Sequence, residues 1–293
     1  MLLSPKQALQ KQLKNNQQGF TLIEMITVIV LLGVISVGIA HFFNFAAQTF
    51  VNTSERDQLI SSARFSVERL NRELRSALPN SARVLNISGA HCLEFVPIVA
   101  TATYLDLSNA NPVDEIEVIE FNEINQQPQQ SYDCVSCNDN LIIYPLSNDD
   151  VYADPTQTSG QLFSLSSVDK TTSGNPDIWL LKLANTVTIE QLSPTDRFYI
   201  VNQVVRYCEE NSELSRITDY NLSDLFEQLT NNVKPTINST KVLMAENVSV
   251  EFKVDDATLY RNSIVQVKLT FSRPSDSDES VSFNHEIHIS NTP

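Results

Sequence analysis

An uninterrupted apolar segment near the N-terminus limits the folds that are open to this chain. Residues 20–45 form a run of 26 residues in which only Glu24 and His41 are ionisable. At about 1.5 Å of rise per residue, a helix of this length crosses a hydrocarbon core of roughly 30 Å. The segment therefore predicts a membrane-spanning helix.

The charges on the two sides of this segment differ in sign. Residues 1–19 carry Lys6, Lys11 and Lys14 without an acidic residue, whereas the whole chain has 35 acidic against 20 basic residues and a net charge of −15. The positive-inside rule keeps the basic end in the cytoplasm and predicts that residues after about 46 lie in the periplasm or outside the cell. Because phosphate contacts need clustered Lys and Arg, the acidic balance argues against nucleic acid as a partner.

An ordinary secretory signal or signal anchor is the alternative interpretation of an apolar N-terminal segment. Two observations oppose it. The small residue that suggests a cut site, Gly19, precedes the apolar run instead of following it. In addition, Glu24 places a carboxylate in apolar sequence, which costs on the order of 3 kcal/mol for membrane insertion and so predicts a partner for that charge.

The run Gly-Phe-Thr-Leu-Ile-Glu-Met at residues 19–25 resembles the signature of the type IV prepilin family. The resemblance implies that a prepilin peptidase cuts between Gly19 and Phe20 and methylates the new amino group of Phe20. It also implies that Glu24 neutralises the amino terminus of a neighbouring subunit during filament assembly. Buried charges that meet in a low dielectric attract strongly, and either one alone is expensive to keep there.

The same resemblance implies partners and a location. The expected partners are other major and minor pilins, the prepilin peptidase and an inner-membrane assembly platform. The chain is expected to sit in the bacterial inner membrane as a single-pass protein with a periplasmic C-terminal domain, and after assembly at the tip of a pilus. The expected chemistry is association without turnover, so we expect no enzyme activity, no catalytic residue, no cofactor and no metal.

Helical periodicity continues beyond the apolar segment. Apolar residues recur every three or four positions from Ile60 to Ala77, which predicts one buried stripe. Three charge pairs are predicted on the other face: Arg64 with Glu68, Glu68 with Arg72, and Arg69 with Glu73. We expect the helix to end near Leu78, because Pro79 disfavours helix at the preceding residue. Many major pilins have a kinking proline in the apolar half, which this chain lacks, so a minor subunit is favoured.

The remainder of the chain is predicted to be rich in β-strands. Alternation of apolar and polar residues is clear in residues 265–271, and residues 224–229 suggest one short helix. We therefore predict an α+β fold, in which a long N-terminal helical spine carries an antiparallel β-sheet globular domain, as in pilins. The predicted parts are a leader (1–19), the transmembrane and assembly half of the helix (20–45), its periplasmic half (46–78) and the globular domain (79–293). The predicted strands are Arg83–Ile87, Cys92–Ile98, Glu115–Phe121, Leu141–Tyr144, Ile178–Leu183, Arg197–Tyr207, Lys241–Val254, Ile264–Phe271 and Val281–Ile289.

Several stretches of the body resemble minor pilins of the mannose-sensitive haemagglutinin pilus. They are residues 55–73, 91–98, 206–216 and 283–291. A more distant resemblance is to the J-type minor pseudopilins of type II secretion and to PilW-like pilins. These resemblances imply a role in initiating or capping assembly. A tip adhesin is a further alternative, but a sugar site usually offers aromatic platforms and Trp179 is the one tryptophan of the chain.

Four cysteines, Cys92, Cys134, Cys137 and Cys208, fall in the part of the chain that is predicted to be exported. A redox centre at Cys134 and Cys137 would need a strand that leads into a helix, whereas the flanking residues indicate a loop. Disulfides are favoured, with three possible pairings. Cys92 with Cys208 and Cys134 with Cys137 are preferred, although the sequence does not fix the choice.

Metal sites were the remaining chemical alternatives. His285 and His288 are three apart on a predicted strand, so they point to opposite faces and cannot readily chelate one zinc ion. Calcium could bind the acidic clusters Asp149, Asp150 and Asp154, or Asp276, Asp278 and Glu279, but neither matches an EF-hand loop and solvated loop acids are favoured. No phosphate-loop, serine-hydrolase or zinc-protease motif is present in the sequence.

Overall fold

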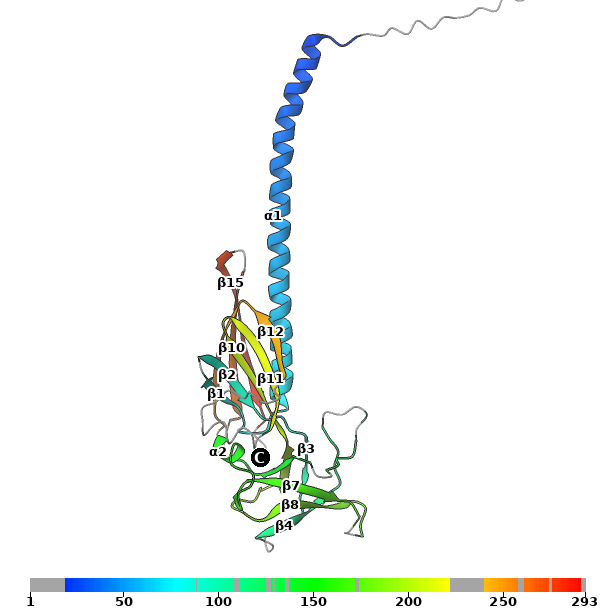
Figure 1. Cartoon of the computed structure of the whole chain (residues 1–293), viewed down its shortest axis with the longest axis vertical. Coiled ribbons are helices and arrows are strands. Elements are labelled where there is room, and N and C mark those ends of the chain that lie inside the picture. The colour runs from blue at the N-terminus through cyan, green and yellow to red at the C-terminus, as the bar shows by residue number, and fades with distance from the viewer. Residues whose placement is uncertain are drawn as a thin grey trace, which may run out of the picture. The chain divides into compact units, whose positions relative to one another are not determined.

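The structure is a computed structural model that describes residues 19–290 except for 88, 108–110, 125–127, 129, 135–136, 172–173, 222–239, 258–260 and 274–275. The chain divides into two compact units, residues 1–55 and 56–293, and each is described by itself. Helix α1 spans Leu22–Arg75 and contributes to both units (Figure 1).

In the first unit, α1 begins after Thr21. The side-chain oxygen of Thr21 accepts a hydrogen bond from the backbone N–H of Glu24 at 3.3 Å, and this satisfies one of the free donors of the first turn. Polar side chains inside the apolar segment bond to the helix itself: Ser36 donates to the carbonyl of Leu32 at 2.7 Å. Such bonds allow hydroxyl groups to lie in apolar surroundings without losing a partner.

The second unit contains two antiparallel sheets that pack face to face. The five-stranded sheet has the order β1-β2-β10-β11-β12 (Figure 1). The three-stranded sheet has the order β13-β14-β15. The strands of these two sheets are β1 (Arg83–Ile87), β2 (Ala90–Phe95), β10 (Gln203–Glu210), β11 (Glu213–Asn221), β12 (Thr240–Glu246), β13 (Val248–Asp255), β14 (Ser263–Arg273) and β15 (Asp276–Ile289).

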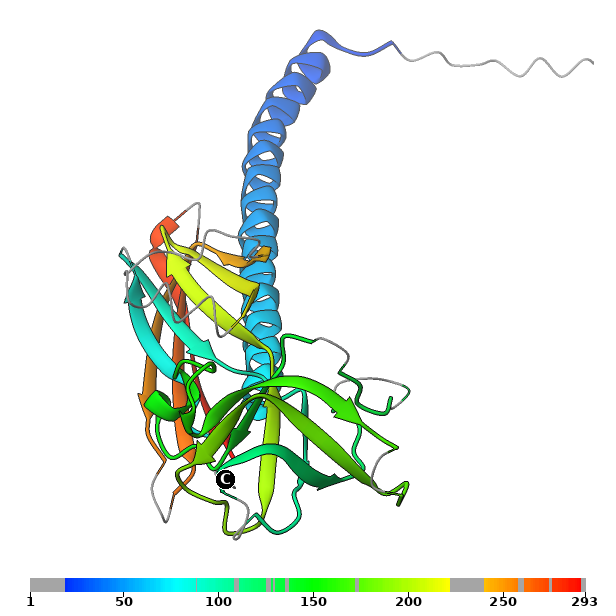
Figure 2. The same cartoon turned by 60° about the horizontal axis from the view of Figure 1, so that its bottom comes forward.

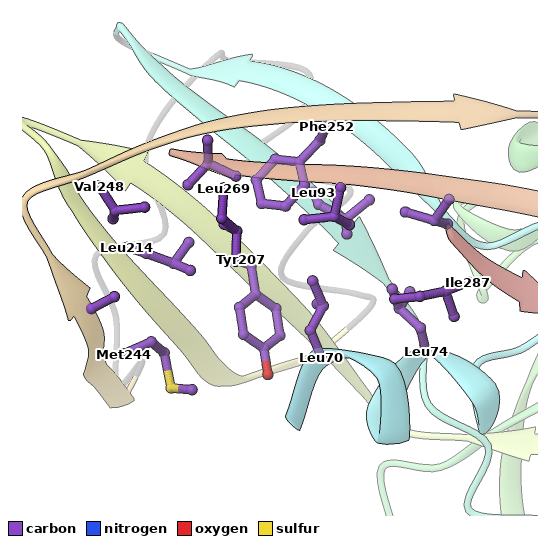
Figure 3. Packing of buried hydrophobic residues seen from close by; sticks show 14 of the residues in the cluster. Leu70, Leu74, Leu93, Tyr207, Leu214, Met244, Val248, Phe252, Leu269 and Ile287 are labelled. Carbon is purple, nitrogen blue, oxygen red and sulfur yellow. The ribbon is translucent and has the colours of Figure 1, made fainter. Parts of the chain in front are cut away.

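The C-terminal part of α1 packs against both of these sheets. Leu70 and Leu74 project into the core beside Tyr207 and Ile287 (Figure 3). Ser66 donates a hydrogen bond to the backbone oxygen of Met244 in β12 at 3.3 Å. Because apolar residues alternate along the strands, each sheet turns one apolar face toward the helix and the other sheet.

A second β region is inserted between β2 and β10, which are neighbours in the five-stranded sheet. Phe95 lies opposite Val205, so the chain leaves the sheet and returns to it at the same place. We call residues 97–201 the inserted lobe, whose strands are green in Figure 2. It holds a seven-stranded sheet of order β3-β9-β5-β7-β8-β4, with β6 paired to β8. Its elements are β3 (Ala100–Thr103), β4 (Val113–Ile119), β5 (Asn140–Ile143), α2 (Asn148–Val151), β6 (Ser159–Gly160), β7 (Leu162–Asp169), β8 (Ile178–Ile189) and β9 (Arg197–Val201).

The inserted lobe has a hydrophobic core of its own, built around Phe121, Phe163, Trp179 and Phe198. A smaller cluster contains residues from both the lobe and the chain before it. Tyr199 of the lobe belongs to this cluster, together with Leu78 and Val96, which precede the lobe. The lobe contains fifteen acidic and three basic residues, a net charge of −12. Most of the chain's net charge of −15 is therefore concentrated in this insertion.

The helix ends at Arg75, three residues before the predicted end. The N–H groups of Ser76 and Ala77 bond to carbonyls only three residues back, which tightens the last turn. The N–H of Leu78 then donates to the carbonyl of Val96 at 2.8 Å. The helix therefore ends because the chain pairs with the segment that follows β2, and it does so four residues before Pro79.

Two predicted strands are each divided between two sheets. The predicted strand Arg197–Tyr207 is β9 of the lobe and β10 of the five-stranded sheet, separated at Asn202. The predicted strand Lys241–Val254 is β12 and β13, separated at Asn247, whose φ of 53° turns the chain from one sheet to the other.

The other predicted strands overlap β1, β2, β4, β5, β8, β14 and β15, whereas β3, β6, β7, β11 and α2 were not predicted. The predicted helix at residues 224–229 lies outside the described residues.

Candidate assembly site

The predicted cleavage point lies at the start of the described chain. Gly19 and Phe20 precede α1, and 79% of the surface of Phe20 is exposed. The backbone of Gly19 has open space around it, since a Cβ atom placed there would meet no atom within 4 Å. The Gly19–Phe20 bond is therefore exposed and lies outside the helix.

Glu24 lies in the first turn of α1 with its side chain exposed. The positive end of the helix dipole favours a carboxylate at this position. Its carboxylate makes no hydrogen bond or ion pair with any residue in the described part of the chain. The backbone N–H of Glu24 donates to Thr21, and its backbone carbonyl accepts a hydrogen bond from the Thr27 hydroxyl. The negative charge is therefore available to a group from another molecule.

The helix that follows Glu24 exposes apolar side chains on every side. Its most apolar 18-residue window has a mean hydropathy of 2.6 and no buried residue. His41 is exposed within the same segment. A helix that is apolar all round is stable when lipid or other apolar helices surround it. By length and composition the segment can cross a membrane.

The four cysteines form two disulfides. Cys92 of β2 lies directly opposite Cys208 of β10, and these two are bonded. Cys134 and Cys137 are bonded to each other in a segment whose described residues are neither helix nor strand. The local structure therefore lacks the strand and helix that a redox centre at this motif would need.

The histidines and the first acidic cluster that were considered as metal ligands are separated or engaged elsewhere, whereas the side chains of Asp276 and Asp278 in the second cluster lie outside the described residues. His285 is partly buried and His288 is exposed, on opposite faces of β15. Asp150 belongs to the capping box of α2 with Ser147, and Asp154 accepts hydrogen bonds from Thr156. Among the described residues, no group of three or more His, Cys, Asp or Glu side chains could hold a metal ion.

A buried ionic network lies across the five-stranded sheet. Glu94 is fully buried and forms ion pairs with Arg83 on one side and Arg206 on the other. The Arg83 guanidinium also lies 3.4 Å from the centre of the Tyr152 ring. Burial and the nearby charge of Glu94 raise the pKa of the Tyr152 hydroxyl, which donates to the carbonyl of Ser81 at 2.7 Å.

A second network joins α1 to the same sheet through Glu73. Its carboxylate accepts hydrogen bonds from Arg69 at 3.1 Å, Tyr207 at 2.9 Å and Arg216 at 2.9 Å. Burial, followed by the charge of Glu73, raises the pKa of Tyr207. Of the three predicted helix pairs, only that of Arg69 with Glu73 is present among the described residues. This ion pair is present because the sheet holds Glu73 in place, whereas ion pairs between exposed side chains on a helix contribute little free energy.

Glu94, Arg206 and Arg216 were not predicted to form ion pairs. A signal was available: Glu94 stands between Leu93 and Phe95 in an otherwise apolar strand, and Arg206 follows two valines. A charge in a strand with both neighbours buried predicts an ion pair across the sheet.

Comparison with known proteins supports the reading of the N-terminal segment. Residues 14–40 match a family model described as the prokaryotic N-terminal methylation motif. No curated protein and no solved structure matches the chain significantly. With the apolar helix and the antiparallel sheets, the motif supports a type IV pilin-like protein of α+β fold. Such proteins are generally structural, they assemble with other pilins, and a prepilin peptidase processes them.

Proposed function

We propose that this chain is a minor subunit of a type IV pilus of the mannose-sensitive haemagglutinin type, that prepilin peptidase cleaves it, and that it helps to initiate or cap pilus assembly. The observation that carries the proposal is the unpaired carboxylate of Glu24 at the start of an apolar helix that carries the methylation motif. The resemblance of residues 55–73, 91–98, 206–216 and 283–291 to the minor pilin MshO supports the choice of pilus.

The proposed role of Glu24 is a contact between subunits. After cleavage, Phe20 carries a positively charged amino group, and Glu24 of a neighbouring subunit neutralises it. Such a pair is strong where apolar helices exclude water, because attraction between charges rises as the dielectric constant falls. The pair also selects one register of helix against helix, since a shifted register leaves both charges unpaired at a cost of several kcal/mol.

Two features favour a minor subunit over the main filament protein. The apolar half of the helix lacks the proline that is common in major pilins. The inserted lobe adds a strongly acidic body to the sandwich, and like charges repel when many copies are packed closely. A subunit of this kind is easier to accommodate in few copies, as at a filament end.

A pseudopilin of a type II secretion system is the second candidate, because the methylation motif is common to both classes of protein. The tip-adhesin alternative is not supported by Trp179, because this side chain is 97% buried in the lobe core and so is not exposed to bind a sugar. Its ring contacts Lys170, whose Nζ lies 4.7 Å from the ring centre, and so does not offer a platform to a sugar.

A deletion strain tests the proposal against the secretion alternative. Cells that lack the gene should lose most surface pili in electron micrographs while secreting exported enzymes at the wild-type level, and a plasmid copy should restore the pili. Normal piliation with a secretion defect would show that the pseudopilin alternative is correct.

A further inference from the structure

A groove of about 430 Å³ lies where the C-terminal part of α1 meets β10 and β11. We call it the arginine groove, because Arg69, Arg72 and Arg216 line it together with one acidic residue, Glu73. Phe65 and Val205 add apolar surface to its wall. The described lining residues therefore carry a net charge of +2.

Glu73 does not neutralise the three arginines. It bonds to Arg69 and Arg216 through their Nε atoms, and its remaining capacity is used by the Tyr207 hydroxyl. The terminal nitrogens of Arg69 and Arg216 donate no hydrogen bond to the described residues, and Arg72 is exposed without a bonded partner among them. Each guanidinium has five N–H donors, so most of the donor capacity of the groove is unused.

The chemistry of the groove selects a carboxylate next to an apolar residue. Terminal guanidinium nitrogens form paired hydrogen bonds with carboxylates, and the fixed positions of Arg69 and Arg216 reduce the entropy lost on binding. Phe65 is 53% exposed, although it is a large aromatic side chain. A free inorganic anion would leave this ring in water, whereas a peptide surface would cover it.

The inserted lobe presents a surface with these properties. On strand β4, Glu115, Glu117 and Ile119 alternate with buried residues and so point outward on one face. The two carboxylates are separated by roughly 7 Å along the strand. Ile119 is 47% exposed beside them. This face, which we call the β4 face, therefore combines the carboxylates of Glu115 and Glu117 with an apolar residue. Lys182 of β8 lies directly opposite Glu115, and its ammonium group is 3.8 Å from Asp169, which shares its charge.

We infer that the arginine groove of one copy binds the β4 face of a second copy of this chain. The contact is heterologous, because the groove and the β4 face are different surfaces, so it links copies head to tail. The inference deepens the proposed function by assigning a contact between globular domains. It predicts weak association that salt reduces, since attraction between exposed charges is screened.

Sedimentation velocity of the purified full-length chain in detergent micelles tests the contact. Wild-type protein should associate at low salt and dissociate as salt is added. Arg72→Glu should weaken association at least tenfold, because it reverses a charge that opposes two carboxylates. Arg64→Glu is the matched control: Arg64 is also an exposed arginine of α1 but does not line the groove, so its reversal should have little effect.

A mixture of two variants distinguishes a head-to-tail contact from other association. Glu117→Arg damages the β4 face and leaves the groove intact, while Arg72→Glu does the reverse. Each variant alone should stay monomeric, and the mixture should associate again, because the intact groove of the Glu117→Arg variant can bind the intact β4 face of the Arg72→Glu variant and the two reversed charges also attract each other. Monomeric wild-type protein at low salt, equal effects of Arg64→Glu and Arg72→Glu, or no association in the mixture would overturn the inference. None of these results depends on pili, so they are independent of the deletion experiment.

Discussion

Arg206 of β10 lies directly opposite Glu94 of β2, and their ion pair is almost completely buried, with 3% and 0% of the side-chain surfaces exposed. Glu94 also lies directly opposite Arg83 of β1. The three side chains form one row across three strands, and Tyr152 from the inserted lobe covers Arg83. This row therefore connects the lobe to the sheet into which it is inserted.

Replacing Glu94 should destabilise the globular part severely. Glu94→Gln removes the charge between two arginines, and an unpaired buried charge costs about 3 to 5 kcal/mol. Denaturant unfolding of the full-length protein in detergent measures the loss. Glu251→Gln is the control, since Glu251 pairs with Lys268 on the exposed face of the three-stranded sheet and should cost less than about 1 kcal/mol. Equal losses of unfolding free energy in the two variants would contradict the prediction that burial makes the Glu94 ion pairs more important than the exposed pair.

The two disulfides should differ in their contribution to stability. Cys92 and Cys208 are 116 residues apart and close a loop that contains the whole inserted lobe, whereas Cys134 and Cys137 are three apart. By the loop-entropy relation, the first stabilises by about 5 kcal/mol and the second by about 2 kcal/mol. Paired Cys→Ser variants, compared by denaturant unfolding, measure the difference. Thiol labelling of the denatured, unreduced wild-type protein should find no free cysteine, and four labelled thiols would refute both pairings.

Alkaline pH should destabilise the fold through its buried tyrosines. Burial raises the pKa of Tyr207, Tyr152 and Tyr132 above the usual value of about 10. Above pH 10, roughly the ordinary tyrosine pKa, the unfolded chain loses these phenolic protons while the folded chain keeps them, so the free energy of unfolding falls as pH rises. Below that pH the three groups are neutral in both states and contribute no pH dependence.

Absorbance titration measures this effect directly. Fewer than the eight tyrosines of the chain should ionise reversibly in the folded protein, and all eight should ionise after denaturation. Tyr132→Phe removes one such group, although it also removes the 2.7 Å hydrogen bond to Asp139. Its unfolding free energy should therefore fall less steeply with alkaline pH than that of the wild-type protein. Complete ionisation of all eight in the folded protein would show that these hydroxyls are not shielded.

The sequence predicted the features that local patterns encode. The apolar run, the basic leader and the motif at residues 19–25 are each short stretches of sequence, and the predicted helix agrees with α1 within three residues at each end. Alternation in residues 265–271 identified β14 because its period of two is a local property.

The inserted lobe could not be predicted in the same way. Its recognition requires knowing that Phe95 pairs with Val205 across more than a hundred residues, and such pairing leaves no local signal. The partners of Glu94 and Glu73 were missed for the same reason, since Arg206 and Arg216 reach them only through strand register. The corner at Asn247 was missed because an asparagine in the left-handed region looks like any polar residue of a strand.

Processing should leave Phe20 as the first residue of the mature protein. The Gly19–Phe20 bond precedes the helix, and the methylation motif covers it. Intact-mass analysis of membrane-extracted protein should give the mass of residues 20–293 with one added methyl group. Gly19→Ala tests the need for glycine and should slow cleavage, while Gly33→Ala, in the exposed face of α1, should leave it unchanged. An uncut Met1, or a cut near residue 47, would contradict the pilin interpretation.

Replacing Glu24 should separate membrane insertion from assembly. Glu24→Ala removes a carboxylate from the apolar segment and introduces a good helix former, so insertion should be unchanged or improved. Piliation should nevertheless fall, because the ammonium of the neighbouring subunit loses its partner at a cost of about 3 to 5 kcal/mol, which weakens association by a few hundredfold or more. Glu24→Gln keeps the shape of the side chain and removes its charge, and it should behave like Glu24→Ala.

Electron microscopy of surface pili, with immunoblots for processing and for the protein level in the membrane, measures the effect of both variants. Normal piliation in both variants at normal protein level would mean that the carboxylate contributes only to solvation.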